Sequence, residues 1–151
     1  MTQQATSLMI EKEVRIAAPV DRVWRALTDY REFGTWFRVA LDGPFEVGRS
    51  VRGTMTYPGH EGAPFEATIE VMETPRRFVY SWVPDGAGDG GPDEPRTRVE
   101  FTLMPTEAGT TLVVRETGFE AVDPDRRVGS MRSHDKGWTA QLQNIEEHVA
   151  A

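Results

Sequence analysis

The sequence predicts a single α+β domain in which a curved antiparallel sheet wraps around a long C-terminal helix. Residues 51–117 contain about four or five runs of alternating apolar and polar residues with turn residues between them, a pattern typical of antiparallel strands. Residues 131–149 change to helical spacing, with apolar residues at Trp138, Leu142, Ile145 and Val149. Because most of the side chains between these positions are polar, we expect the helix to lie on the sheet through one apolar face.

The segment before the main sheet predicts one strand and two short helices. Residues 1–7 are polar and are expected to form a flexible N-terminus, and apolar residues then alternate over residues 8–16, with Lys12 as the charged exception in the inner row. Residues 20–27 and 30–37 each place apolar side chains on one side at helical spacing, and Asp29 ends the first helix or caps the second. A weak strand over residues 39–45 leads into the sheet.

Two features are predicted within and after the sheet. Residues 78–83 are apolar on both faces, which indicates a central strand. Residues 84–95 are rich in Gly, Pro and Asp and predict a flexible loop, whose aspartates lack the spacing of a calcium-binding loop. Further on, Asp123 and Pro124 favour a helix start, but Gly129 and Ser130 predict an irregular lead-in before the long helix of residues 131–149.

Composition excludes several classes of function. The 151 residues fit one domain, and the absence of Cys excludes disulfides and thiolate metal sites. A net charge of -7 argues against binding to nucleic acid, and no apolar run is long enough for a membrane span, so a cytoplasmic protein is expected. The histidines His60, His134 and His148 have no metal-ligand spacing, and neither a metal nor a cofactor is predicted.

Three segments stand out together: residues 18–29, residues 78–82, and Gly137-Trp138 followed by Leu142 and Ile145. With the order of the expected elements, they resemble the START-like (SRPBCC) superfamily, in the branch of the activator of heat-shock protein 90 ATPase homologue-like proteins. The resemblance covers nearly the whole chain. It implies the helix-grip fold, in which a pocket opens between the sheet and the C-terminal helix. It also implies a ligand from the classes that this superfamily binds, which are lipids, hormones and polyketides.

Position in that fold predicts which side chains line the pocket. The predicted ligand-binding residues are Trp36, Phe37, Met55, Tyr57, Tyr80, Trp82, Phe101, Glu116, Trp138 and Gln141. Core packing is the alternative explanation for most of the aromatic residues, since burying each contributes about 2 kcal/mol. Those with a polar tip need a hydrogen-bond partner when buried, so we expect a few polar groups among apolar walls.

Glu116 is the one weak catalytic candidate. A buried carboxylate without a partner tends to stay protonated at neutral pH, which suits a general acid. The alternative is that Glu116, near its strand end, pairs with an arginine or reaches water. The sequence contains neither a serine nucleophile elbow nor a glycine-rich phosphate loop.

Three hypotheses about function remain open. The first is a non-enzymatic protein that binds a small hydrophobic or aromatic molecule. The second is a polyketide-cyclase-like or hydrolase-like enzyme that uses Glu116 and a pocket tyrosine. The third is a chaperone-activator-like interaction module with an exposed apolar patch, for which a chaperone or a second copy of the chain would be the partner.

Overall fold

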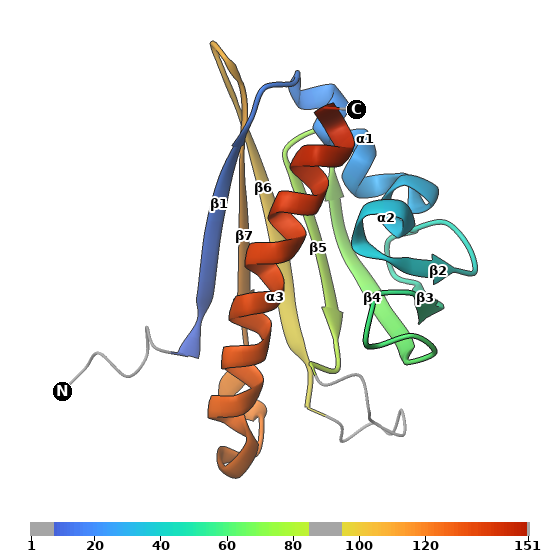
Figure 1. The fold of residues 1–151 in the computed structure, drawn as a ribbon, viewed down its shortest axis with the longest axis vertical. Coiled ribbons are helices and arrows are strands. Elements are labelled where there is room, and N and C mark those ends of the chain that lie inside the picture. The colour runs from blue at the N-terminus through green and yellow to red at the C-terminus, as the bar shows by residue number, and fades with distance from the viewer. Residues whose placement is uncertain (1–7, 85–94, 151) are drawn as a thin grey trace, which may run out of the picture.

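The computed structural model describes residues 8–84 and 95–150, and in it seven antiparallel strands form one sheet (Figure 1). The expected flexible segments, residues 1–7 and almost all of 84–95, lie outside the described residues. The strand order is β1-β7-β6-β5-β4-β3-β2. The strands are β1 (Ile10–Ile16), β2 (Val39–Leu41), β3 (Ser50–Met55), β4 (Pro64–Glu73), β5 (Arg77–Trp82), β6 (Thr97–Thr106) and β7 (Gly109–Thr117). The predicted α+β helix-grip architecture is confirmed, and β5 is the central strand.

The helices lie on the concave side of the sheet (Figure 1). They are α1 (Val20–Thr28), α2 (Tyr30–Phe37), the single-turn 3-10 helix η2 (Phe119–Ala121) and α3 (Pro124–Ala150). The two short helices agree with the prediction because Asp29 separates them: its carboxylate accepts hydrogen bonds from the backbone N–H groups of Arg31 (2.9 Å) and Glu32 (3.4 Å). The weak strand expected over residues 39–45 is shorter and ends at Leu41.

The long helix begins earlier than predicted. It starts at Pro124, so Gly129 and Ser130 lie inside it and the irregular lead-in was wrong. Asp123 caps the helix by accepting the backbone N–H of Asp125 at 3.1 Å. Arg127 then donates to the carbonyl oxygens of residues 119, 120 and 122 at 3.0 Å each, which ties the first turn to η2. These contacts offset the roughly 0.5–1 kcal/mol that a glycine costs inside a helix.

The core lies between the sheet and the second half of α3. Leu142, Ile145 and Val149 are buried there, as the helical spacing predicted. Lys12, the charged residue in the inner row of β1, forms an ion pair with Asp135 of α3 at 3.0 Å. The first half of α3 is therefore joined to the sheet edge by an ion pair, and Met131 packs against the core from the same half.

Among the described helices none is both long and apolar enough to cross a membrane.

Candidate functional site

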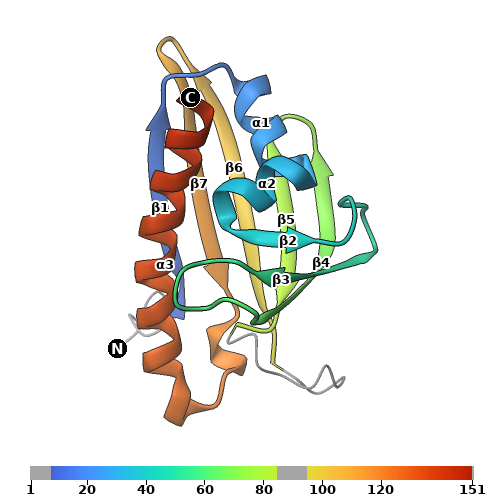
Figure 2. The ribbon, with the colours of Figure 1, turned by 45° about the vertical axis from the view of Figure 1, so that its right-hand side comes forward.

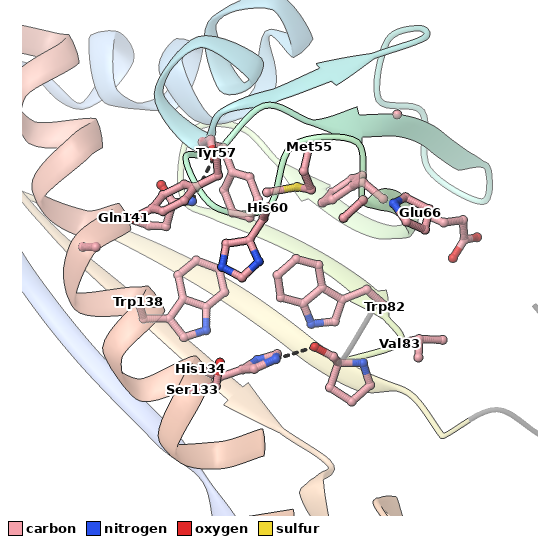
Figure 3. A pocket seen from close by; sticks show the side chains of 18 of the residues that line it. Met55, Tyr57, His60, Glu66, Trp82, Val83, Ser133, His134, Trp138 and Gln141 are labelled. Carbon is pink, nitrogen blue, oxygen red and sulfur yellow. Dashed lines mark hydrogen bonds between the residues drawn. The ribbon is translucent and has the colours of Figure 1, made fainter. Parts of the chain in front are cut away.

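A pocket of about 880 Å³ lies between the middle of α3 and the part of the sheet formed by β3, β4 and the end of β5 (Figure 3). Figure 2 shows the loop between β3 and β4 reaching from the sheet to the middle of α3, and residues from both line the pocket. The lining residues are Phe37, Arg52, Gly53, Met55, Tyr57, His60, Ala63, Pro64, Phe65, Glu66, Trp82, Val83, Pro84, Arg96, Ser133, His134, Lys136, Gly137, Trp138, Ala140 and Gln141.

The structure divides the ten predicted ligand-binding residues into two groups. Six line the pocket: Phe37, Met55, Tyr57, Trp82, Trp138 and Gln141. The other four are buried in the core and do not line it: Trp36, Tyr80, Phe101 and Glu116. Trp36, for example, is held in the core by a 2.8 Å hydrogen bond from its indole N–H to the carbonyl oxygen of Ala26. An inward direction on a strand or helix was therefore not enough to place a side chain in the pocket wall.

Four aromatic rings form one continuous surface of the pocket, which we call the aromatic floor: Phe37, Phe65, Trp82 and Trp138. The two indoles are stacked, with ring centroids 5.9 Å apart and an interplanar angle of 29°. Phe37 lies 6.1 Å from Trp82 and 6.2 Å from Trp138, and Phe65 lies 5.9 Å from Trp82. Helix α2 supplies one of these rings, α3 another, and strands β4 and β5 the remaining two, so the whole fold is needed to assemble the floor.

Glu116 lies beneath this floor and has no exposed surface. Its Oε1 accepts hydrogen bonds from the indole N–H of Trp138 and from His134 Nδ1, both at 2.8 Å. Its Oε2 accepts the indole N–H of Trp82 at 3.0 Å and the hydroxyl of Thr97. Both oxygens are thus fully engaged, and the carboxylate fixes the orientation of the two stacked indoles and of His134.

These contacts rule out the protonated state considered for a Glu116 without a partner. Burial raises the pKa of Glu116, but the hydrogen bond and charge of His134, with hydrogen bonds from Thr97 and Trp82, outweigh burial and lower the pKa below its ordinary value of 4.5. Among the described residues its charged partner is a histidine, where an arginine had been the alternative. Glu116 is therefore an ionised group that holds its neighbours in position, and it does not reach the pocket as a general acid would.

His134 was given no role by the sequence, and it was expected at a helix start. It lies well inside α3 and lines the pocket, directly below the two indoles in Figure 3. Its Nδ1 faces the carboxylate of Glu116, and its Nε2 faces the carbonyl oxygen of Pro84. Because both of these oxygens are acceptors, the doubly protonated imidazolium satisfies both contacts. Its positive charge balances the charge of Glu116.

Several polar residues of the wall were also missed. Arg96 connects two strands, β4 and β5, by donating to the carbonyl oxygen of Ser81 (2.9 Å), the carboxylate of Glu66 (3.1 Å) and the hydroxyl of Thr68 (3.3 Å). For the missed residues on α3, helical spacing could have served as the signal. Once Trp138 is assigned to the inner face of the helix, a residue four positions earlier or three positions later shares that face. The described residues contain no group of three or more His, Cys, Asp or Glu that could hold a metal ion.

Comparison with known proteins gives a family. Residues 17–150 match the family model described as activator of Hsp90 ATPase homolog 1-like protein. No curated protein matches the sequence. A solved protein of Mesorhizobium loti is 24% identical with a TM-score of 0.76, over 94% of this chain and 96% of that one.

Two further solved structures share the fold. A protein in the dynemicin biosynthetic locus is 24% identical with a TM-score of 0.74, and the match covers 95% of this chain but 48% of that one. The Aha1 dimer of Colwellia psychrerythraea is 15% identical with a TM-score of 0.72, over 93% of this chain and 95% of that one. Since the family model spans most of the chain and the fold agrees, this protein belongs to the family of activator of Hsp90 ATPase homolog 1-like proteins, within the START-like superfamily.

Proposed function

We propose that this protein binds a small aromatic molecule in the pocket between α3 and the sheet. The observation that carries the proposal is the orientation of Trp82 and Trp138. Both indole N–H groups donate to Glu116 below the floor, so the part of each ring that remains for the pocket is apolar. Aromatic rings stack on such surfaces and gain about 0.5–1.5 kcal/mol per pair beyond burial of area.

The size of the pocket supports the same function. At about 880 Å³ it lies within the range of roughly 300–1,000 Å³ that small-molecule sites occupy. A helix packed flat on the sheet would have counted against ligand binding, and the first half of α3 is not packed in that way: Ser130 is its one buried residue before Trp138.

Gly137 supports the proposal from the helix side. It lies in the pocket wall, and a Cβ atom added there would meet no atom within 4 Å. A glycine inside a helix costs roughly 0.5–1 kcal/mol relative to alanine, so a side chain here would stabilise the helix but would occupy the pocket. The glycine keeps this space available to a ligand.

The two alternative functions have less support. An enzyme of the cyclase or hydrolase type would need Glu116 to reach its substrate, and both oxygens of Glu116 are engaged below the floor. A protein-interaction module would need a contiguous apolar patch. The large hydrophobic residues exposed on the described part of the chain, Val47, Met104 and Val128, lie on three separate segments.

The proposal is tested with a variant of α3 whose new side chain fills the pocket. A second variant on the same helix serves as the matched control. Gly137→Leu places a side chain in the pocket, whereas Gly129→Leu places it where a Cβ also meets nothing within 4 Å but outside the pocket wall. Binding of the neutral aromatic 2-naphthamide is measured by NMR titration of ¹⁵N-labelled protein, following the indole N–H signals of Trp82 and Trp138.

We expect 2-naphthamide to shift both indole signals in the wild type and in Gly129→Leu, and to bind Gly137→Leu about tenfold more weakly or worse. Both variants should remain folded, because leucine has a higher helix propensity than glycine. No shift in the wild type with any member of a panel of flat aromatic, fatty-acid and polyketide-like compounds would reject ligand binding. The labelled sample would then be mixed with a chaperone to test the interaction module.

A further inference from the structure

The charges around the pocket oppose those of the whole chain. The chain has 24 acidic and 17 basic residues and a net charge of -7. Apart from its two histidines, His60 and His134, the pocket wall instead contains three basic residues, Arg52, Arg96 and Lys136, and one acidic residue, Glu66. Residues drawn at random from this acidic chain would have a negative net charge, so the excess of positive charge in the pocket wall needs an explanation.

The one acidic residue of the wall is already neutralised. Glu66 is paired with Arg96 at 3.1 Å, and Arg96 also holds Ser81 and Thr68, so these two residues stabilise the sheet. The ionised carboxylate beneath the floor, Glu116, is balanced by His134 and has no exposed surface. Neither acid is free to bind a cationic ligand.

Two cations remain, and we call them the basic rim: Arg52 on β3 and Lys136 on α3. Within the described part of the chain, neither side chain has a hydrogen bond or an ion pair. They come from the two elements on either side of the pocket. Tyr57 and Ser133 also line the wall, and their hydroxyl groups have no partner among the described residues. Every charged group of the wall that is still available is therefore positive, and hydroxyl donors lie in the same wall.

We propose that the ligand is an anionic aromatic molecule, such as an aryl carboxylate or a phenolate, whose ring lies on the aromatic floor and whose anionic group is bound by the basic rim. The proposal rests on the function proposed above and adds the chemical class of the ligand. A carboxylate would replace the water around Arg52 or Lys136 by charge-assisted hydrogen bonds. A cationic ligand of the same shape would be repelled.

The test compares ligands of equal shape and different charge by isothermal titration calorimetry: 2-naphthoate, neutral 2-naphthamide and cationic 2-naphthylmethylammonium. We expect naphthoate to bind about tenfold more tightly than naphthamide, and the cation to bind most weakly. Higher ionic strength should weaken naphthoate binding and leave naphthamide binding unchanged, because salt screens only the charged contact.

Variants of the basic rim then locate the effect. Arg52→Gln and Lys136→Gln should each weaken naphthoate binding about threefold, and the double variant should bind naphthoate and naphthamide equally. Arg15→Gln is the matched control, since Arg15 is exposed in β1 and does not line the pocket. It should bind naphthoate as the wild type does.

The outcomes separate this inference from the function on which it rests. Equal binding of naphthoate and naphthamide to the wild type, or preference for the cation, overturns the anionic ligand and leaves an aromatic pocket. A tenfold preference for naphthoate that survives in the double variant also overturns the role of the basic rim. If no naphthalene derivative binds, the anionic ligand proposed here is also overturned, and the panel of flat aromatic, fatty-acid and polyketide-like compounds decides whether the function on which it rests fails too.

Discussion

The two halves of α3 hold the protein together in different ways. From Trp138 onward the helix buries Gln141, Leu142, Ile145 and Val149, and this half lies beside α1 and α2 (Figure 2). Before Trp138, Ser130 is the one buried residue, and the helix is attached by polar contacts such as the ion pair between Lys12 and Asp135. The pocket lies where the two halves meet, and its lining residues on α3 come from both: Ser133, His134, Lys136 and Gly137 from the first half, and Trp138, Ala140 and Gln141 from the second.

Each half has one contact between a histidine and a glutamate. In the first half His134 contacts Glu116, whose side chain is 0% exposed. In the second half His148 contacts Glu32 at 2.9 Å, with side chains 20% and 22% exposed, and Glu32 also accepts from Arg22 (2.7 Å) and Arg25 (3.0 Å). The carboxylate of Glu116 is therefore fully buried beside one histidine, whereas that of Glu32 is partly exposed to solvent and contacts two arginines in addition to its histidine.

The largest expected effect is on stability, and it differs between variants of these two contacts. His134→Leu leaves the carboxylate of Glu116 buried without a cation and should lower the free energy of unfolding by about 3 kcal/mol or more. His148→Leu should lower it by about 1 kcal/mol or less, because Glu32 keeps both arginines. Urea denaturation at neutral pH measures both values, and equal losses would contradict the difference between the two halves.

A smaller and graded effect is expected at acidic pH. Burial raises the pKa of Glu32 as it does that of Glu116, but in both cases hydrogen bonds and neighbouring positive charge lower it below 4.5. A carboxyl group whose pKa is lower in the folded state stabilises the protein above the pKa of the unfolded chain, and this contribution is lost as the pH falls through the folded-state pKa. The free energy of unfolding should therefore decrease below about pH 4.5.

Variants of the two histidines show how much of this loss of stability at acidic pH comes from each contact. His134→Leu should show a shallower loss than the wild type, since Glu116 no longer gains from its histidine in the folded state. His148→Leu should follow the wild type more closely. Urea denaturation from neutral pH down to about pH 3 gives the three curves, and parallel curves would mean that His134 does not set the pKa of Glu116.

The smallest effect concerns a polar group in the core below the pocket. The hydroxyl of Tyr80 is buried and has no hydrogen-bond partner among the described residues. Burial, with the nearby charge of Glu116, raises the pKa of Tyr80 well above 10. The folded protein should therefore lose stability as the pH rises above the pKa that this tyrosine has in the unfolded chain.

Removing that hydroxyl should stabilise the protein. Tyr80→Phe should raise the free energy of unfolding by about 1 kcal/mol at neutral pH and should reduce the loss of stability above about pH 10. Tyr57→Phe, on the half-buried pocket tyrosine, is the control and should leave stability within about 0.5 kcal/mol of the wild type. A loss of stability in Tyr80→Phe would show that the hydroxyl is satisfied after all.

The sequence predicted elements whose determinants are local. Helix α2 was predicted from Tyr30 to Phe37 because its apolar spacing and its cap at Asp29 lie within nine residues of each other. The start signal at Asp123 and Pro124 was recognised, but the continuity of α3 through Gly129 and Ser130 was missed. The contact that stabilises its first turn, from Arg127 to the carbonyl oxygens of η2, depends on how the chain turns before the helix. Helix propensity at Gly129 gave the wrong answer where tertiary contacts decided the outcome.

The site was predicted only in part, for a related reason. Alternation on the strands gave the inward direction of Tyr80, Phe101 and Glu116, and all three are buried. Whether an inward side chain reaches the pocket depends on where α3 stands away from the sheet, which no local pattern encodes. The ion pair between His134 and Glu116 joins residues 18 positions apart on different elements, and the sequence offered no spacing that identifies it.

The stacked pair of Trp82 and Trp138 also gives the protein an optical signal of its own. Two indoles fixed 5.9 Å apart at 29° couple their electronic transitions, and such a pair contributes an exciton couplet to the ultraviolet circular dichroism spectrum. One indole belongs to the sheet and the other to α3, so the amplitude of the couplet reports the distance between helix and sheet. The unlabelled protein can therefore be screened against candidate ligands in solution, with the Trp82→Phe spectrum as the reference without coupling.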